Sequence, residues 1–530
     1  MRPGIEKQGQ PGSPEVPGVS RSLYRTIKSR LTGLSPELSQ SLWKVSLVVL
    51  LGFILVMTIS LKPFITNEIS HEDGFQNLKM AYNLAFYGVM SNSDNPEEEL
   101  EPTNLREPIP IAAMAAYLKL HPSISSSMNL EQVNSEDTII LVKYHNLLWA
   151  FLCLLGAAAV VLRVVQPRPV AFLVALAAVG LVQQYFLQLS LVIDRTYTEV
   201  QAGALMVWVS FVLIRALQTR KYFWYILSGV CLGLLTLTKA VFLYIGIGVV
   251  FTLLVVCLVK QTRIKRLANI KLIGVMAACM IAVLMPWMLR NRIQLGTWSI
   301  SGRGGDVLFV RATKNQMNNT EFKGAFYLYA PPALKKYIGD YLGFTDTDLE
   351  AGGSLQRINR DGSSSFGWPD LQAEWAGKPE DAVSFYRSAR AERVRLEMYY
   401  EEQGAEDPAQ LAADALQQRA IEMIKSDPIK HLKTSLVFAW RGTWIDGVRF
   451  RYLVAGFTAL WILGFWGLIR RNDEMIGITL PAMGVFAFHA LFTHFIPRYS
   501  MILIPILMIS LVVSIGWILV RIDSQITQKS

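Results

Sequence analysis

The sequence predicts an all-α polytopic membrane protein that crosses the bilayer about ten times and carries an extracytoplasmic loop domain of mixed or helical structure. Hydrophobic residues make up 52% of the 530-residue chain and charged residues only 17%, and the mean hydropathy is +0.32. Several apolar runs approach the roughly 20 residues needed to cross a bilayer. The net charge of +10 comes from basic residues that lie in short loops between those runs, which is typical of the signals that set membrane topology. Membrane lipids are therefore expected as partners, and nucleic acid is not.

The amino-terminal residues 1–42 are rich in Pro, Gly, Ser and basic side chains, which predicts a flexible cytoplasmic segment. A first span follows at about residues 42–61. No small-residue cleavage site comes after it, so we interpret it as an uncleaved signal anchor. All the cysteines lie in apolar runs, where their spacing fits neither a disulfide framework nor a zinc site. They are Cys153, Cys231, Cys257 and Cys279.

The first outer loop, residues 62–137, carries two adjacent acids, Glu72 and Asp73, just beyond the first span. Charge beside a bilayer is costly, and two neighbouring acids repel each other, which can prepare one of them as a general base. The alternative is that both acids only favour the start of a helix. That helix is expected over Phe75–Val89, where the apolar spacing predicts a helix on the membrane surface. A second apolar helix is expected over Ile111–Leu120.

Further spans complete a predicted transmembrane core over residues 43–292. They are expected at about residues 139–162, 169–189, 200–217, 224–237, 241–259 and 272–289. Each even-numbered span ends in a basic loop, which the positive-inside rule requires if the amino terminus is cytoplasmic.

Residues 293–448 are polar and carry charged helical patterns over Glu380–Tyr400 and Pro408–Lys425, which predicts one extracytoplasmic domain. Within it, Leu436–Ile445 is apolar but short and contains Arg441, and we interpret it as a helix at the membrane interface. Residues 449–520 predict the last spans, at about 452–469, 476–492 and 500–519, and residues 521–530 a cytoplasmic tail. Both termini are thus expected in the cytoplasm, below a plasma or inner membrane.

On this topology, charged residues scattered along the chain meet at the outer face of the membrane. They are Glu72, Asp73, Arg106, Glu107, Asp194, Arg195, Glu199, Lys239, Arg290, Arg292, Arg303, His494 and Arg498. A single Arg or Lys in such a place is more often an interfacial anchor or part of a structural ion pair. Convergence of the whole set on one side instead indicates a site for a charged, lipid-linked substrate.

A sugar carried on a polyprenyl phosphate would explain this set. Breaking the anomeric C–O bond leaves growing negative charge on the phosphate, which fixed cations stabilise, and Lys239, Arg290 and Arg498 lie at the right depth. The acceptor hydroxyl or amine needs a carboxylate to take its proton, and Asp73 or Glu72 could do so. The turn Gly302-Arg303-Gly304-Gly305 is either an amide nest for phosphate or a plain turn.

Several short motifs occur in a defined order along the chain. They are Glu72-Asp73 with Tyr82 and Gly88 after it, Arg106-Glu107-Pro108-x-Pro110, Thr198-Glu199 at the start of a span, Leu234-x-x-Leu237-Thr238-Lys239, Pro286-Trp287-x-x-Arg290-Asn291, and Pro497-Arg498-Tyr499. In this order and placement, from about Trp43 to Ala312 and again near Arg498, the chain resembles the C-type (GT-C) superfamily of membrane glycosyltransferases. The resemblance is greatest to the branch that contains protein O-mannosyltransferases and the lipid A aminoarabinose transferase.

The resemblance implies a GT-C-like transmembrane bundle and an inverting glycosyltransferase with its active site on the extracytoplasmic face. Its donor would be a polyprenyl-phosphate-linked sugar. The first-loop acid, Asp73 or Glu72, would be the catalytic base, and Lys239 and Arg290 would contact the lipid phosphate. The further candidates for binding substrate are Arg498, Arg106, Glu107 and Glu199.

That branch requires no cofactor, a divalent metal is optional in it, and the sequence shows no convincing metal cluster. Residues 302–435 lack the β-trefoil pattern of eukaryotic O-mannosyltransferases, and Lys239 stands where many relatives have Arg. The acceptor therefore stays open between a lipid, a glycan and a protein.

Two other functions are considered. A lipid or glycan transporter or flippase would place ionisable residues near the bilayer midplane, on helices broken by Gly or Pro. A surface-glycan ligase or polymerase would carry its key acids in a late outer loop. The charges here lie at one face of the membrane, and the acids lie in the first outer loop, so the enzyme is favoured.

Overall fold

The computed structural model describes residues 36–94, 100–260, 263–302, 304–360, 364–445 and 450–528. By packing, the chain divides into two units, residues 1–52 and 53–530. Every regular element in the described ranges is a helix, as the sequence predicts. The boundary between the units lies inside α2 (Pro36–Ile59), whose apolar side chains are mostly exposed, as expected for a helix that faces lipid.

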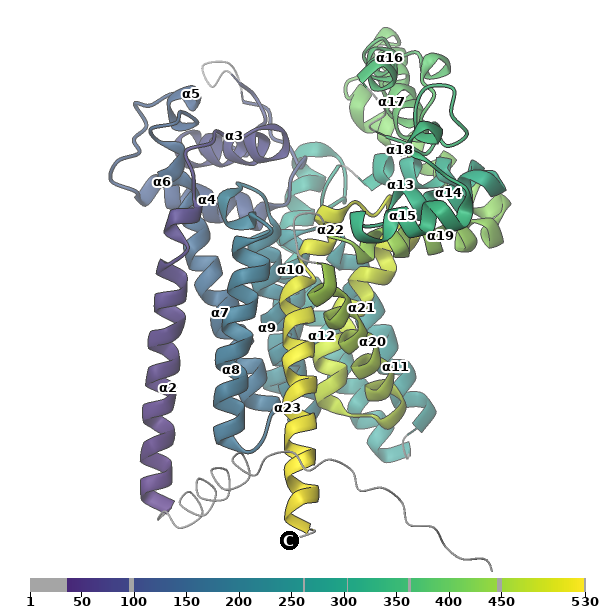
Figure 1. The fold of residues 1–530 in the computed structure, drawn as a ribbon. Helices are drawn as coiled ribbons and strands as arrows, with labels where there is room; N and C mark the ends of the chain where they lie inside the picture. The colour runs from purple at the N-terminus through teal and green to yellow at the C-terminus, as the bar shows by residue number, and fades with distance from the viewer. Residues whose placement is uncertain are drawn as a thin grey trace, which may run out of the picture. The chain divides into compact units, whose positions relative to one another are not determined.

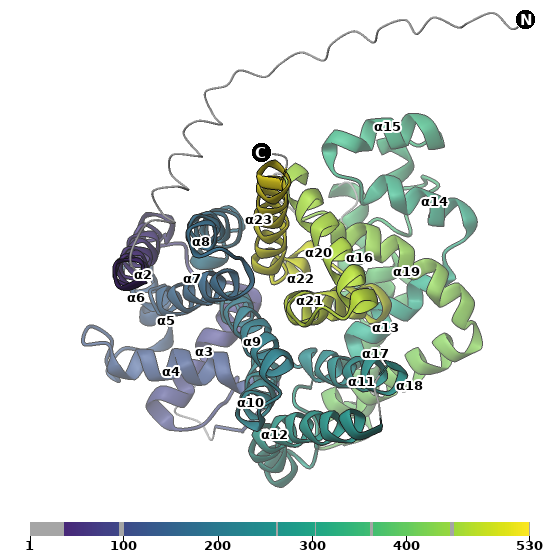
Figure 2. The same ribbon diagram turned by 90° about the horizontal axis from the view of Figure 1, so that it is seen from below.

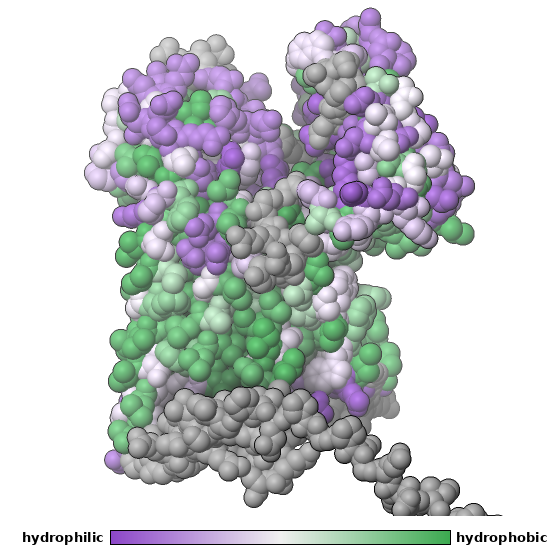
Figure 3. Space-filling view, in the orientation of Figure 1, coloured by the Kyte–Doolittle hydropathy of each residue, from purple (hydrophilic) through white to green (hydrophobic). Residues whose placement is uncertain are grey.

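Nine helices in the described ranges are long and apolar enough to cross a membrane, so the chain is an integral multi-pass membrane protein. Besides α2 they are α6 with α7 (Ile139–Lys143 and His145–Val164), α8 with its π-helical end η2 (Arg168–Val182 and Gln183–Gln188), α9 (Glu199–Thr219), α11 (Phe242–Lys260), α12 (Arg263–Leu295), α20 (Phe450–Arg470), α21 (Asp473–Phe492) and α23 (Ile504–Gln528). Figure 2 shows the helices of the second unit end-on. In Figure 3 hydrophobic residues cover the face of these helices that is in view.

The expected fifth span is α10 (Tyr222–Thr238), an apolar helix of only 17 residues. The sequence predicts about ten spans, and α10 is the one that falls short of membrane-crossing length. It packs against α9 and α12. A Cβ on Gly229 would lie 2.2 Å from the carbonyl oxygen of Met276, so only glycine allows α12 to come this close. Because Lys239 follows α10 directly, this packing helps to position it.

The first outer loop folds around a small core of its own. It contains η1 (Lys62–Phe64), α3 (Glu72–Tyr87), α4 (Pro108–Leu120) and α5 (Leu130–Val133). Leu78, Met80 and Tyr82 lie on more than one side of α3, and each is at most 1% exposed. Helix α4 packs against α3 in the same hydrophobic core. The apolar spacing predicts the helix but gives no sign of the second helix that packs on it, and its place on the membrane surface stays a prediction.

The polar region after α12 is helical in all its regular elements. They are α13 (Gly304–Thr313), η4 (Lys314–Gln316), α14 (Asn319–Leu328), α15 (Pro332–Leu342), η5 (Asp346–Leu349), α16 (Ser364–Trp375), η6 (Pro379–Asp381), α17 (Phe385–Glu402), α18 (Pro408–Ser426) and α19 (Pro428–Thr443). Helices α13, α17 and α18 share a hydrophobic core. Figure 1 draws these helices at the same end of the membrane-length helices as α3 and α4.

Helix α19 extends the interfacial segment that the sequence predicts at Leu436–Ile445. It begins eight residues earlier, at Pro428, because Asp427 caps the backbone N–H of Lys430. Ile429, Leu432 and Leu436 recur at helical spacing and are all exposed. Two short elements complete the described fold, η3 (Val192–Asp194) and α22 (Pro497–Met501).

Candidate functional site

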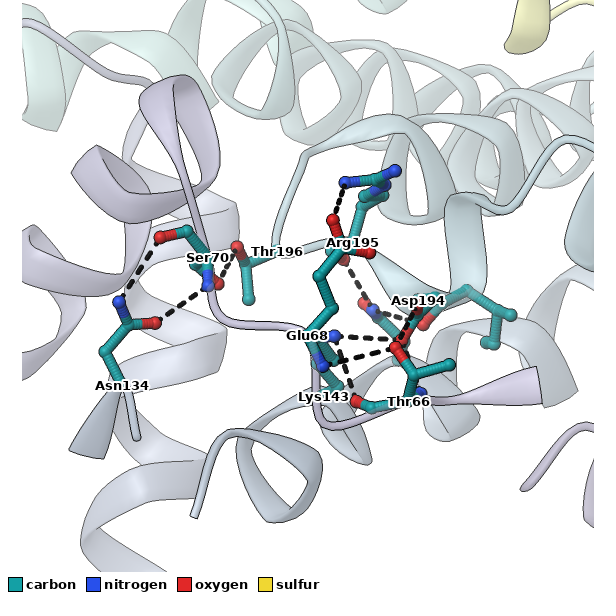
Figure 4. Close-up of polar contacts among 10 residues, drawn as sticks. Thr66, Glu68, Ser70, Asn134, Lys143, Asp194, Arg195 and Thr196 are labelled. Carbon is teal, nitrogen blue, oxygen red and sulfur yellow. Dashed lines mark hydrogen bonds and ion pairs between the residues drawn. The ribbon is translucent and has the colours of Figure 1, made fainter. Parts of the chain in front are cut away.

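The segment that leads into α3 is held by residues far from it in the sequence. Asp194 accepts hydrogen bonds from Thr66 N at 2.7 Å, Thr66 Oγ1 at 2.8 Å and Lys143 Nζ at 2.9 Å. Further along the segment, Asn134 Oδ1 accepts one from Ser70 N at 2.9 Å (Figure 4). Asp194 and Lys143 are both buried, which makes their ion pair a clamp on the approach to α3.

The first turn of α3 is closely packed and its backbone is strained. A Cβ on Gly74 would lie 2.6 Å from Thr196 Oγ1, so a side chain at this position would force the two segments apart. Glu72 has a φ of +45°, a conformation that costs a residue other than glycine about 1–3 kcal/mol. Both neighbours of Asp73 are thus constrained, which fixes the direction in which its carboxylate leaves the backbone.

Asp73 is the counter-ion of two arginines from distant segments. Its Oδ1 accepts a hydrogen bond from Arg106 Nη2, and its Oδ2 accepts one from Arg498 Nη2 at 2.7 Å. Arg106 Nη2 also donates to Gln76 Oε1 at 2.7 Å, one turn further along α3. The Asp73 side chain keeps 24% of its surface exposed, so the carboxylate is reachable from outside.

Glu199, the first residue of α9, forms a second ion pair beside the first. Its side chain is only 2% exposed, and its Oε1 accepts a hydrogen bond from Lys239 Nζ at 2.8 Å. The same oxygen lies 3.6 Å from Arg498 Nε, so Arg498 joins the two carboxylates. The other oxygen, Oε2, has no hydrogen-bond partner among the described residues. We call these five residues, Asp73, Arg106, Glu199, Lys239 and Arg498, the polar network.

Aromatic rings border the polar network at Arg498. The guanidinium lies 4.8 Å from the centre of the Tyr197 ring. Burial alone would lower the pKa of Arg498, but the charges of Glu199 and Asp73 outweigh it, and the net effect is to raise that pKa. Burial raises the pKa of the neighbouring Tyr499, whose phenol also interacts with Asp73. Arg498 is therefore held charged, and Tyr499 as a neutral phenol.

Three more of the predicted site residues lie outside the polar network. Glu107 Oε1 accepts a hydrogen bond from Ala240 N at 2.9 Å, which ties the start of α4 to the residue after Lys239. Arg290 Nη1 donates to the Thr103 carbonyl at 3.1 Å and so binds the segment that precedes Arg106. Glu72 is exposed and makes no side-chain contact within the described ranges, whereas its neighbour Asp73 makes two ion pairs.

The rest of the predicted outer set is dispersed. Arg195 lies 3.6 Å from Glu68, Arg292 is exposed, and the ring of His494 lies 5.8 Å from that of Tyr499. Arg303 lies outside the described residues. Sequence reasoning did not single out Gln76 or Tyr197, although each had a signal: Gln76 is three residues from Asp73 on one helix, and Tyr197 precedes Thr198-Glu199.

Two other residues of the sequence motifs have structural roles. Tyr82 is buried and its hydroxyl donates to the Met128 carbonyl at 2.7 Å. Gly88 has a φ of +77° and ends α3 in the left-handed conformation that glycine adopts readily. Both hold the first outer loop together.

The polar network can balance and bind negative charge with protein groups alone. It contains three cations and two carboxylates within hydrogen-bond or ion-pair distance of one another. Within the ranges that the structure describes, no three His, Cys, Asp or Glu side chains are grouped so as to hold a metal ion.

Comparison with solved structures returns membrane glycosyltransferases. The chain is similar to the archaeal oligosaccharyltransferase AglB from Archaeoglobus fulgidus, solved with an inhibitory peptide and a dolichol-phosphate, with 11% identity and a TM-score of 0.47 over 91% of this chain and 51% of that one. It is also similar to ArnT from Cupriavidus metallidurans, with 11% identity and a TM-score of 0.32 over 88% of this chain and 77% of that one. The arabinosyltransferase EmbB from Mycobacterium smegmatis matches with 12% identity and a TM-score of 0.27, over 96% of this chain and 42% of that one.

The chain spans about half the length of the archaeal oligosaccharyltransferase that it matches. No protein-family model matches it, and no curated protein is similar to it in sequence. Likenesses with TM-scores below 0.5 carry no functional assignment, so the function is inferred below from the side chains of this chain.

Proposed function

We propose that the protein is an inverting glycosyltransferase that takes a sugar from a polyprenyl-phosphate donor at the extracytoplasmic face of the membrane. One observation carries the proposal: a partly exposed carboxylate, Asp73, pairs with two arginines from separate segments of a membrane protein, and one of them, Arg498, also reaches the carboxylate that pairs with Lys239. The motif order that resembles the GT-C superfamily supports the same reaction.

In the proposed reaction the acceptor hydroxyl or amine attacks the anomeric carbon of the donor. The bond between that carbon and the phosphate oxygen breaks, and its electron pair stays on the phosphate. The proton of the acceptor passes to Asp73. Arg498 and Lys239 stabilise the leaving phosphate. In the structure, which has no substrate, these two cations pair instead with the carboxylates of Asp73 and Glu199.

Arg106 keeps Asp73 in position during this exchange, because it also donates to Gln76. Glu107 and Arg290 fix the two segments that carry Lys239 and Arg106, so we assign them positioning roles rather than direct contact with the phosphate.

The proposal is tested by sugar transfer in detergent, using a panel of labelled polyprenyl-phosphate sugars with extracts of cell-surface lipid, glycan and protein as acceptors. Removing a general base costs about 10²–10⁴-fold in rate, so we expect a loss of that size in Asp73→Asn. Glu72→Gln is the matched control, since Glu72 is the adjacent acid and makes no contact. Wild-type rates in Asp73→Asn would refute the assignment of the base.

A transporter is separated from a transferase by the products. Donor flux across liposomes that leaves the sugar on its lipid would contradict glycosyl transfer. Release of polyprenyl phosphate together with a glycosylated acceptor would support it.

A further inference from the structure

Lys314, in η4, is a buried cation with no counter-ion among the residues that the structure describes. The residue is 3% exposed, yet its ammonium makes no hydrogen bond and no ion pair within the described ranges. Its one ring contact is distant, with Nζ 5.9 Å from the centre of Phe438. An isolated buried ammonium is costly, and proteins normally pair such a group or place it where a ligand binds.

Among the described residues, the charged side chains that act on Lys314 have the same sign as its own. Arg441, Arg311 and Arg360 act on it electrostatically, and together with burial they lower its pKa to about 7. Arg311 is satisfied within the fold, because its Nη2 donates to Ser435 Oγ at 2.8 Å and to the His431 carbonyl at 3.0 Å. Arg311 therefore has a structural role, and Lys314 does not share its partners.

His494 faces the same group of cations. It is 7% exposed, and its Nδ1 has no hydrogen-bond partner among the described residues. Arg441 Nη1 donates to the His494 carbonyl at 3.1 Å, so the guanidinium lies against this loop. Arg441 forms no ion pair with any described carboxylate; its other contact is with the ring of Tyr329, 4.5 Å away. Lys314, Arg441 and His494 thus bring three donors together, and no described carboxylate pairs with them.

We propose that Lys314, Arg441 and His494 form an anion site that binds a phosphoryl group. An ammonium, a guanidinium and an imidazole N–H are the donors that phosphate oxygens take in proteins, and a bound dianion would supply the charge that these residues lack. The site is separate from the polar network but adjoins it. The ring of Tyr499 contacts that of His494, and its phenol interacts with Arg498. The evidence for this site is the charge of its own residues, so the proposal does not depend on whether the chain transfers a sugar.

The phosphoryl group has three possible sources: a free phosphate compound, a polyprenyl phosphate, or the headgroup of a bilayer phospholipid. The experiment uses the full chain in detergent and in nanodiscs. Thermal unfolding is followed with inorganic pyrophosphate, with a short-chain polyprenyl phosphate, and in nanodiscs with and without phosphatidylglycerol. A rise in unfolding temperature with any one of the three that Lys314→Met reduces supports the site and identifies the source.

The direction in which Lys314→Met changes the unfolding temperature distinguishes a lysine that binds a ligand from one that only supports the fold. We expect Lys314→Met to unfold at a higher temperature than the wild type when no anion is present, because it removes a buried charge without a partner. We also expect it to weaken binding of the stabilising anion about tenfold to a hundredfold. Lys323→Met is the matched control, since Lys323 is exposed on α14 and makes no contact in the described ranges.

Two results would overturn the proposal. One is that none of the three anions stabilises the wild-type protein. The other is that Lys314→Met lowers the unfolding temperature and leaves anion binding unchanged, as expected if the lysine only supports the fold. Activity in the transfer assay is measured separately, so that loss of the anion site and failure of the transferase proposal are told apart.

Discussion

Glu199 depends on its partners more than any other acid of the polar network. Its side chain is almost fully buried at the start of α9, where the helix dipole favours negative charge, and one of its oxygens has no hydrogen-bond partner in the described ranges. Lys239 supplies the shortest of its ion-pair contacts, at 2.8 Å, and Arg498 is further away. The stability of this part of the protein should therefore depend on Lys239 in a way that a double-mutant cycle can measure.

We predict that Lys239→Met destabilises the protein by about 3–5 kcal/mol, because it leaves the Glu199 carboxylate buried without its main partner. Adding Glu199→Gln should recover part of that loss, since no uncompensated charge then remains. Thermal unfolding in detergent, followed by tryptophan fluorescence, measures both changes. Strictly additive losses in the double variant would contradict the coupling.

The pH dependence of anion binding should report Lys314. Its pKa is about 7 in the folded chain against 10.5 for an ordinary lysine, so between these values the unfolded chain binds one more proton than the folded chain. The contribution of Lys314 to stability therefore rises with pH from about 7 to about 10.5. A bound anion favours the charged ammonium form of Lys314 over the neutral amine. Above about pH 7, anion binding therefore leads Lys314 to take up one proton.

We predict that sulfate, which does not titrate in this range, binds about twentyfold more weakly at about pH 8.5 than at about pH 6.5. The two histidines near Lys314 do not change charge there. Burial and nearby cations lower the pKa of His431, on α19, to about 4, and lower that of His494 well below its usual range. Burial lowers the pKa of Arg311 to about 9, which lies above the range compared. Isothermal titration measures the effect, and affinity that is flat over this range would exclude Lys314 as the titrating group.

At the scale of elements, α10 positions Lys239 through its contact with α12. Gly229 and Gly233 lie four residues apart, and a Cβ on Gly233 would come within 2.7 Å of the Val283 side chain. This spacing of small residues lets two membrane helices approach closely. The shortness of α10 and this close approach together set the depth at which Lys239 leaves the helix.

We predict that Gly229→Val lowers the unfolding temperature and abolishes binding of polyprenyl phosphate to the polar network, because the new side chain would collide with the Met276 carbonyl and push α10 away. Gly248→Val on α11 is the control, since a Cβ there meets nothing within 4 Å. Thermal unfolding and lipid binding are measured on both variants. Equal behaviour of the two would mean that the α10–α12 contact does not position Lys239.

The elements show what sequence patterns can and cannot predict. Apolar length and basic loops are properties of single segments, so the membrane helices were predictable, although α12 begins and α23 ends nine residues beyond the expected bounds and α10 is too short to count as a span. Pairing between helices depends on side chains far apart in the chain. The periodicity of α3 could not reveal that α4 covers it, and nothing near Lys314 in the sequence shows that Arg441 and His494 lie beside it.

At the scale of the molecule, the polar network is assembled by topology. Asp73, Glu199, Lys239 and Arg498 each lie at or just beyond an end of a helix, and alternation of the spans brings these ends to one side. The convergence was predictable because it needs only the direction of each span. Which of Asp73 and Glu72 joins the polar network was not predictable, because it depends on which carboxylate meets Arg106 and Arg498.

The basic loops predict the orientation of the whole chain in the membrane. The loops at the other ends of the spans carry basic residues, such as Arg168, Lys221 and Arg470, and so should face the cytoplasm. The polar network and α14 would then face outward. In a variant whose four native cysteines are replaced by alanine, a new cysteine at Lys323, on α14, should react with a membrane-impermeant maleimide in intact cells.

A new cysteine at Lys221, between α9 and α10, should react with the same reagent only after the membrane is permeabilised. Both positions are exposed, so access across the membrane rather than burial decides the labelling. The reverse pattern would place Asp73 on the cytoplasmic side, where the outward-facing reaction proposed here could not occur. Labelling of both sites in intact cells would instead show that the probe had entered, and a cytoplasmic marker protein labelled in parallel detects that.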